Sequence, residues 1–528
     1  MGHYLHAIWQ RPETPLWLAA ALFVVGFTAI YRLLFSDRSL PDLAIVGAKP
    51  NEWFPLQRAR WRNTVDMKTA TVQAYESRDR ACIFPIGASQ VLVHLPHKEL
   101  QWLAERPDSD VNVLAQIIDM LQLDYTVMDP GLVHRPSHIP LIAGALTRET
   151  GNLVPELLDE IEHSVSEAWG TDTQAFKEIA VYPSMTKVVG QTTNRAFVGL
   201  PYCRDPALLE AAISFAQGIP VAAALLHSLP APLRPLLAPF ITLPNRINTN
   251  RFFRILRSDI KQRQARLSSQ PTGTAEKGRN DFLEWSVKQA QTLDDPYFGK
   301  PDTLAGRILI VNFTSIHTTS FAITHAILDL AAGKQEYIDE LREEITSCLA
   351  AHGGRWDKRS LADMTKLDSV LRESQRINSF ATTSINRMVV NPAGITTPSG
   401  VHIKPGVMVC APAYPVFHDP AIYSHADEFK PFRFAEQRAA VAQEGASATQ
   451  KARTAFTTAS PDYTNFGYGK HACPGRFFAA TALRLTLAYM VMNYDFELQD
   501  KRAENSWFAM NRIPPVSATI RLRRRVVR

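Results

Sequence analysis

One short loop near the C-terminal end constrains this chain more than any other stretch. It reads Phe466-Gly467-Tyr468-Gly469-Lys470-His471-Ala472-Cys473-Pro474-Gly475. Its three glycines allow the backbone to pass close to a large flat group. A cysteine held in such a loop can present its thiolate to a metal ion, and no second cysteine or acidic ligand lies nearby in the sequence. The loop therefore indicates a single axial ligand, as in thiolate-bound haem. The alternative is a buried structural cysteine at the start of a helix, because free cysteines are commonly buried.

The loop resembles the haem-binding signature of the cytochrome P-450 family, F-x-x-G-x-[RH]-x-C-x-G. Every fixed position is met, by Phe466, Gly469, His471, Cys473 and Gly475. The resemblance implies a mainly α fold with small β-sheets, in which these residues bind haem b and Cys473 ligates the iron. It also implies a monooxygenase that takes electrons from NADPH through a reductase. His471 stands where many members carry an arginine that faces a haem propionate.

Composition limits the class of protein. The chain has 528 residues, of which 46% are hydrophobic and 20% charged, so a large core is expected and global disorder is not. A formal charge of +6 is mild for this length and does not indicate nucleic-acid binding. The five cysteines are widely spaced without a C-x-x-C pair, which argues against a disulfide framework or a zinc site. Five arginines within residues 521–528 are either a solvated strand end or a patch attracted to anionic partners.

Residues 16–31 near the N-terminus carry no charge and are mostly apolar. A bilayer span usually needs about 20 residues, but Arg32 can reach the interface by snorkelling, and Trp17 and Tyr31 lie where interfacial aromatics are common. We expect one uncleaved transmembrane helix within residues 1–39, in the endoplasmic reticulum membrane. One catalytic domain over residues 40–528 would then face the cytosol, in keeping with the basic residues that follow the apolar stretch. A cleaved signal peptide is the alternative.

A second segment, Ile308–Leu328, has no Asp, Glu, Lys or Arg over its whole length. Its centre is rich in hydroxyl and amide groups, which a lipid environment would leave without partners. We therefore expect a long helix buried in a soluble core, with a polar patch turned toward a site. By resemblance, residues 314–319 match the family's A-G-x-[DE]-T-[TS] pattern, and Thr318 fits the threonine beside bound oxygen. The usual acid is replaced by His317, which is expected either to relay protons or to bond a neighbouring carbonyl.

Two further motifs match the family by position. Glu373 and Arg376 share one face of a predicted helix over residues 366–378. By resemblance they form a buried charge network with Arg433 that supports the haem loop. Arg387 lies where a basic residue often faces a haem propionate.

The remaining stretches predict minor elements. Residues 385–390 and 401–409 are expected to form strands, with turns at residues 391–394 and 404–406. Residues 264–281 are expected to form a polar surface loop or linker, and residues 435–459 an inserted loop of low complexity. The pocket is expected around Phe313, Ile316, Thr319 and residues 380–383.

Three functions remain open at this stage. The first is insertion of one oxygen atom from O2 into a lipophilic molecule, such as a terpenoid-like or polyketide-like secondary metabolite, by hydroxylation or oxidation. The second is a reductase-independent haem isomerase, dehydratase or peroxygenase. The third is a non-catalytic haem-binding protein.

Overall fold

The computed structural model describes residues 40–526 apart from 77–78, 88–89, 270–277, 444, 446 and 509, together with Phe23, Gly26, Phe27 and Ile30. Apart from those four residues, the predicted anchor over residues 1–39 lies outside the described residues, and so does Arg528.

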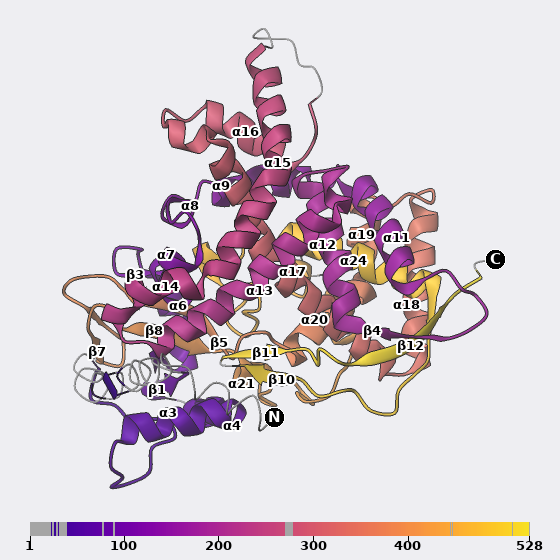
Figure 1. Cartoon of the computed structure of the whole chain (residues 1–528). Coiled ribbons are helices and arrows are strands. Elements are labelled where there is room, and N and C mark those ends of the chain that lie inside the picture. The colour runs from indigo at the N-terminus through magenta and orange to yellow at the C-terminus, as the bar shows by residue number, and fades with distance from the viewer. Residues whose placement is uncertain are drawn as a thin grey trace, which may run out of the picture.

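The expected central helix is present as α17, Pro301–Ala331. A proline in its first turn suits a helix start, because the missing N–H has no partner there anyway. Helices α12 (Val181–Phe197), α13 (Pro206–Ser228), α20 (Thr365–Ile377) and α24 (Arg476–Asn493) pack against it, and Figure 1 shows all five at the centre of the molecule. The mainly α fold expected from the sequence is confirmed.

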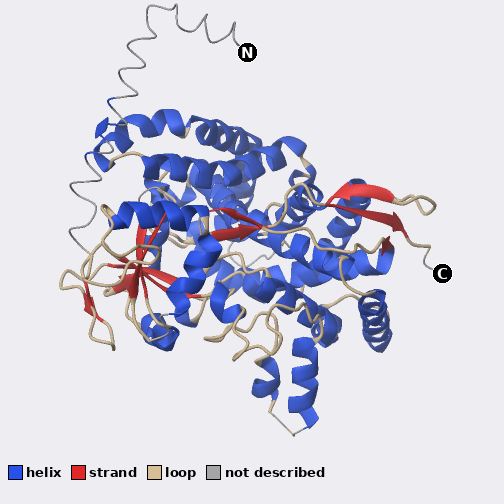
Figure 2. Cartoon of the chain, turned by 90° about the horizontal axis from the view of Figure 1, so that it is seen from below, coloured by secondary structure: helices blue, strands red, loops and turns tan. Residues whose placement is uncertain are grey.

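Small sheets flank this helical core, as Figure 2 shows. The largest has the order β1-β2-β8-β5-β3, in which only β2 and β8 pair in parallel. A three-stranded sheet has the order β4-β12-β9, and β12 is the last strand that the structure describes. There Arg521 pairs with Glu497, and both Arg523 and Arg525 pair with Asp495. Three of the five arginines of this segment thus meet acids of the same fold.

Helix α13 is long and apolar enough to cross a membrane. It has 23 residues and a mean hydropathy of 1.6, but half of this stretch is buried inside the protein. Core helices of soluble proteins meet the same criteria, so α13 is part of the fold and is not evidence for a membrane span.

Helices α12 and α17 are joined by a reciprocal amide pair. Asn194 Nδ2 donates to Asn312 Oδ1 at 2.7 Å, and Asn312 Nδ2 donates to Asn194 Oδ1 at 3.1 Å. Both side chains are fully buried, and each also donates to a carbonyl of its own helix. The pair therefore satisfies two polar groups inside the core, where an unmade hydrogen bond would be costly.

We expect Asn312→Ala to lower the free energy of unfolding by about 1–3 kcal/mol, because it leaves the Asn194 amide buried without its partner. The midpoint of chemical unfolding measures this. The double variant Asn194→Ala/Asn312→Ala should cost clearly less than the sum of the two single variants. Additive losses would show that the pair does not couple the two helices.

The turn expected at residues 404–406 is present and separates β7 from β8. Two sequence expectations need correction. The inserted loop over residues 435–459 contains the end of α22 and all of α23. The linker expected from Gln264 is helical to Ser269, since α15 continues that far.

The elements of the N-terminal half, in chain order, are α3 Pro55–Val65, α4 Met67–Glu76, β1 Cys82–Ile86, β2 Gln90–His94, η1 His97–Glu99, α5 Leu100–Glu105, β3 Val111–Asn112, α6 Val113–Met120, α7 Leu123–Thr126, α8 Gly131–His134, α9 His138–Leu141, η2 Ile142–Leu146, α10 Thr147–Glu149, α11 Val154–Trp169, β4 Lys177–Ala180, α12, η3 Tyr202–Arg204, α13, η4 Ala231–Leu233, α14 Arg234–Ile241 and α15 Leu243–Ser269.

Those that follow are α16 Phe282–Gln291, η5 Pro296–Gly299, α17, α18 Gln335–Ala351, α19 Lys358–Asp363, α20, β5 Thr383–Val389, β6 Ile395–Thr396, β7 His402–Ile403, β8 Met408–Pro412, α21 Tyr414–Phe417, α22 Arg433–Gln443, α23 Ala448–Ala452, η6 Gly469–His471, α24, β9 Tyr494–Phe496, β10 Ser506–Phe508, β11 Asn511–Ile513 and β12 Thr519–Arg524.

Candidate active site

The cysteine loop is closed by a backbone hydrogen bond between its two ends. The Cys473 N–H donates to the Phe466 carbonyl at 2.7 Å, which accounts for the seven-residue spacing between them. Gly467 and Gly469 adopt φ of 72° and 70°, a left-handed conformation that side chains disfavour. Gly475 has φ of −87°, and a Cβ added there would only touch the side chain of Ile142 at 3.6 Å. The described protein itself therefore does not require glycine at position 475.

Cys473 lies at the end of this loop, three residues before α24 begins at Arg476. The other four cysteines are buried or half-buried, whereas Cys473 is exposed. Its surroundings still desolvate the sulfur, and this burial raises the pKa of the Cys473 thiol. The N–H groups of Gly475 and Arg476 donate to the sulfur and oppose that rise in pKa. The loop thus offers an accessible sulfur with donors that favour its thiolate form.

Helix α17 presents two hydroxyl groups in the middle of its buried length. Thr314 and Thr318 are exposed, although most of the helix is buried around them. They lie one turn apart, so they share a face. The Thr318 hydroxyl donates to the Thr314 carbonyl at 2.8 Å, which leaves its oxygen free to accept. Ile316 and Thr319, both expected in the pocket, are instead buried in the core.

His317 is turned toward α12. Its Nδ1 lies 3.0 Å from the Tyr182 hydroxyl, and its Nε2 is buried without a hydrogen-bond partner among the described residues. Burial lowers the pKa of His317, and the backbone of Ile213, acting as a hydrogen-bond partner, raises it in part. The imidazole is therefore neutral near pH 7. The sequence did not reveal Tyr182 as its partner.

Arg387 and His471 both lie close to Asp108. His471 Nε2 is 2.7 Å from Asp108 Oδ1, and Lys470 Nζ is 2.9 Å from the same oxygen. Arg387 is buried, forms no ion pair with any described residue, and donates to the Asn386 carbonyl. Burial lowers the pKa of Arg387 to about 10, and the charge of Asp108 opposes this. A buried guanidinium without an acidic partner fits a site for an added carboxylate.

A bulge in β5 sets the direction of Arg387. The register with β8 shifts between Ser384 and Arg387, and Ile385 has φ of 51°, which is unusual for a β-branched residue. Bulges of this kind re-aim side chains next to functional sites. The sequence carried no clear sign of the bulge.

The expected charge network of Glu373, Arg376 and Arg433 is confirmed. Arg376 forms two hydrogen bonds with the Glu373 carboxylate, both at 2.8 Å. Arg433 Nε donates to the same carboxylate at 3.0 Å. All three side chains are buried, and the arginines also donate to backbone carbonyls, among them those of Ala426 and Ser424. The network therefore fixes the chain between α21 and α22.

The sequence analysis missed a second set of α20 residues that holds the segment before the loop. Asp368 accepts the Phe456 N–H at 2.8 Å and is paired with Arg484 of α24. The Gln375 carbonyl accepts from Asn465 at 3.1 Å. Phe456 is buried against Phe466, with ring centroids 5.2 Å apart. Helix α20 thus holds both the approach to the cysteine loop and the helix that leaves it.

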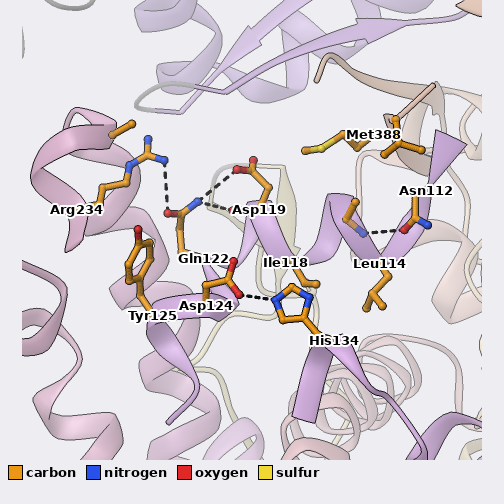
Figure 3. Close-up of a pocket in the computed structure, with 13 residues that line it drawn as sticks. Asn112, Leu114, Ile118, Asp119, Gln122, Asp124, Tyr125, His134, Arg234 and Met388 are labelled. Carbon is orange, nitrogen blue, oxygen red and sulfur yellow. Dashed lines mark hydrogen bonds and ion pairs between the residues drawn. The ribbon is translucent and has the colours of Figure 1, made fainter. Parts of the chain in front are cut away.

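A separate cavity of about 610 Å³ lies between α6, α7, α14 and β5. Figure 3 shows Arg234, Gln122 and Asp119 linked in a row, with the Asp124–His134 pair beside them. No residue of the cysteine loop or of α17 lines this cavity. It is therefore distinct from the place where Cys473 and Thr318 are exposed.

Comparison with known proteins identifies the family. Residues 136–517 match the model of the cytochrome P-450 family. The chain belongs to the cytochrome P-450 family. It is 31% identical to the cytochrome P-450 monooxygenase gloP of Glarea lozoyensis, over 96% of this chain and 95% of gloP. It is 32% identical to the cytochrome P-450 monooxygenase htyF of Aspergillus rugulosus, over 92% of this chain and 73% of htyF.

A solved structure agrees at the level of the fold. The retinoic acid-bound cyanobacterial CYP120A1 superposes with a TM-score of 0.64 at 17% identity, over 92% of this chain and all of that one. The protein is a P-450 monooxygenase, so it uses haem b and receives electrons from NAD(P)H through a reductase.

The residues present fit this cofactor. Haem b is a flat apolar group with two carboxylates, so it would cover an exposed cysteine and an exposed helix face. Cys473 is the exposed cysteine, and Thr314 and Thr318 lie on the exposed helix face. The buried and unpaired Arg387 would meet a carboxylate.

Proposed function

We propose that this P-450 inserts one oxygen atom from O2 into a lipophilic secondary metabolite, with Cys473 as the iron ligand. The observation that carries the proposal is that Cys473, alone among the five cysteines, is exposed, and that it lies in a loop closed by the Phe466–Cys473 backbone hydrogen bond. Phe466, Gly469, His471 and Gly475 would shape the haem site around it, and Arg387 would bind a propionate.

The chain's own residues would orient the reaction and manage protons. The haem, when bound, supplies the oxidative chemistry and draws electrons from the reductase. Cys473 would ligate its iron, and the Thr318 hydroxyl, whose oxygen is free to accept, would hold a proton donor. His317 stands next to Thr318 as a neutral imidazole that can pass a proton. The buried Glu373 network would keep the chain behind the loop rigid.

The substrate is proposed to be terpenoid-like or polyketide-like. Phe380, which is exposed, and Phe321 lie 5.5 Å apart by ring centroids and border the same region as His317. An apolar wall with a few hydroxyl groups suits such molecules. The relatives' occurrence in fungi supports secondary metabolism as the setting, with hydroxylation or another oxidation as the reaction.

We further propose that residues 1–39 form a single-pass anchor in the endoplasmic reticulum membrane, with residues 40–528 in the cytosol. The charge-free stretch over residues 16–31 and the basic residues that follow it support this. An NADPH-dependent reductase at the same membrane would then be the electron donor.

Reconstitution with a reductase tests the proposed function. We expect product formation that requires NADPH, O2 and the reductase. Thr318→Ala should lower the product formed per NADPH by at least about tenfold, because a proton-directing hydroxyl is lost. The control is Ser320→Ala, whose buried hydroxyl donates to the Ile316 carbonyl and should leave the yield unchanged.

Other outcomes would decide against the proposal. Conversion that proceeds equally without the reductase would indicate an isomerase, dehydratase or peroxygenase. Haem binding without any conversion of a broad lipophilic metabolite set would indicate a non-catalytic haem-binding protein.

A further inference from the structure

The cavity between α6, α7, α14 and β5, which the cysteine loop does not line, has a volume of about 610 Å³. Small-molecule sites usually have volumes of roughly 300–1,000 Å³. Leu114 and Ile118 of α6 and Met388 of β5 belong to an apolar part of its lining. Figure 3 shows these three on the right of the view and Arg234 on the left. The cavity can therefore hold an organic molecule that has an apolar body and a polar end.

Two opposite charges line this cavity without an ion-pair partner. Arg234 of α14 and Asp119 of α6 are both half-buried, and neither forms an ion pair with any described residue. Arg234 Nε donates to the Leu229 carbonyl at 3.2 Å, but its Nη1 lies 3.5 Å from Gln122 Oε1. The Asp119 carboxylate is likewise 3.5 Å from Gln122 Nε2. Contacts of this length are weak, so both charges keep most of their capacity to bind another group.

The Gln122 side chain separates the two charges. Gln122 is buried, and its Nε2 donates to the Asp119 carbonyl at 2.7 Å, which fixes the amide in place. Figure 3 shows the amide between the Arg234 guanidinium and the Asp119 carboxylate, where a direct ion pair would otherwise form. A ligand that satisfies both residues must therefore carry a negative and a positive group that are separated from each other.

The other polar groups of the lining favour the same arrangement. Asp124 already has a partner in His134, whose Nε2 lies 2.7 Å from its carboxylate. The Tyr125 hydroxyl forms no hydrogen bond within the described part of the chain, and Figure 3 shows it on the Arg234 side of the cavity. A phenol can donate to a carboxylate. The Arg234 side thus offers two donors to a negative group, while the Asp119 carboxylate can accept from a positive one.

We propose that this cavity binds a small zwitterion with an apolar body, namely a free amino acid with an aromatic side chain. Its carboxylate binds Arg234 and Tyr125, and its ammonium group binds Asp119. Its ring lies against Ile118 and Met388. Hydrogen bonds between ionised groups are the strong ones, so the two charges select the ligand. The site is separate from the proposed oxidation and does not depend on it.

Carbon-13 NMR of the haem-loaded protein, labelled at its methionine methyl groups, tests the site. The Met388 signal, assigned by its absence in Met388→Leu, should move when L-phenylalanine is added, because this side chain lines the cavity. Two probes each lack one charge: 3-phenylpropionate has no ammonium group, and 2-phenylethylamine has no carboxylate. Each should bind at least about tenfold more weakly than L-phenylalanine, since one charge-assisted contact is lost.

Two variants assign each charge to its residue. In Arg234→Met, 2-phenylethylamine should lose its disadvantage relative to L-phenylalanine, because the carboxylate no longer meets a guanidinium. In Asp119→Asn, 3-phenylpropionate should lose its disadvantage in the same way. Comparing probe and variant in a cycle isolates each pairwise contact. The matched control is Arg246→Met, which removes a half-buried arginine of α15 that donates to Thr242 and does not line the cavity. It should leave all three affinities unchanged.

Four results would overturn the inference. The first is a Met388 signal that L-phenylalanine does not move. Equal affinity for 3-phenylpropionate would indicate a site for simple carboxylates, and equal affinity for 2-phenylethylamine a site for amines. Equal effects of Arg234→Met and Arg246→Met would show that Arg234 does not bind the ligand. Because none of these measurements uses turnover, they stand whether or not the proposed oxidation occurs.

Discussion

Cys473→Ala is expected to abolish the thiolate-haem Soret band of the reduced, carbon monoxide-treated protein, together with all reductase-dependent turnover. The physical reason is that the loop offers one exposed sulfur, at the end of a seven-residue span closed by the Phe466–Cys473 backbone bond. Removal of the sulfur leaves no described side chain in the loop that can ligate iron in the same way.

A second cysteine provides the matched control. Cys348, on α18, is half-buried, and burial raises the pKa of its thiol. Cys348→Ala should retain the Soret band and the activity. Persistence of the band in Cys473→Ala, or its loss in Cys348→Ala, would assign the ligand to another residue.

Glu373→Ala is expected to cause the largest loss of stability, about 3–5 kcal/mol. The substitution removes the one carboxylate shared by Arg376 and Arg433, and both guanidinium groups would then be buried without a negative charge. Because the same arginines bind the carbonyls of Ala426 and Ser424, the chain between α21 and α22 should loosen as well. Thermal unfolding and the haem content per protein measure these effects.

An exposed pair of the same spacing supplies the control. Lys501 and Glu504 form an i,i+3 ion pair at 3.2 Å with both side chains mostly exposed. Surface pairs contribute about 0–1 kcal/mol, so Glu504→Ala should barely change the unfolding midpoint. Comparable losses in the two variants would contradict a special role for burial at Glu373.

Elements whose pattern depends on near neighbours could be predicted from the sequence. Helix α20 and the long α17 were both expected, because helical periodicity and turn residues act over a few positions. The turn at residues 404–406 was expected as well, because Pro-Gly acts locally, and it divides residues 401–409 into β7 and β8. The helices within residues 435–459 were missed because an Ala- and Gln-rich composition fits a helix as well as a polar loop.

In the candidate site too, the parts set by near neighbours in the sequence could be predicted. The spacing of Phe466, Gly469 and Cys473 is a local constraint, because a closed loop with left-handed glycines needs those residues at those distances along the chain. The sequence by itself therefore determined the cysteine loop and the Glu373–Arg376 pair, both of which are set by short-range backbone geometry.

Only the tertiary structure decided which side chains meet across elements. Tyr182 reaches His317 over 135 positions, and Asp368 reaches Arg484 over 116. The β5 bulge that aims Arg387 likewise depends on the partner strand. Such pairings follow from how helices and strands pack, and packing register is not written in the periodicity of any one segment. For this reason the sequence determined the cysteine loop, whereas the fold decided which side chains surround His317, Asp368 and Arg387.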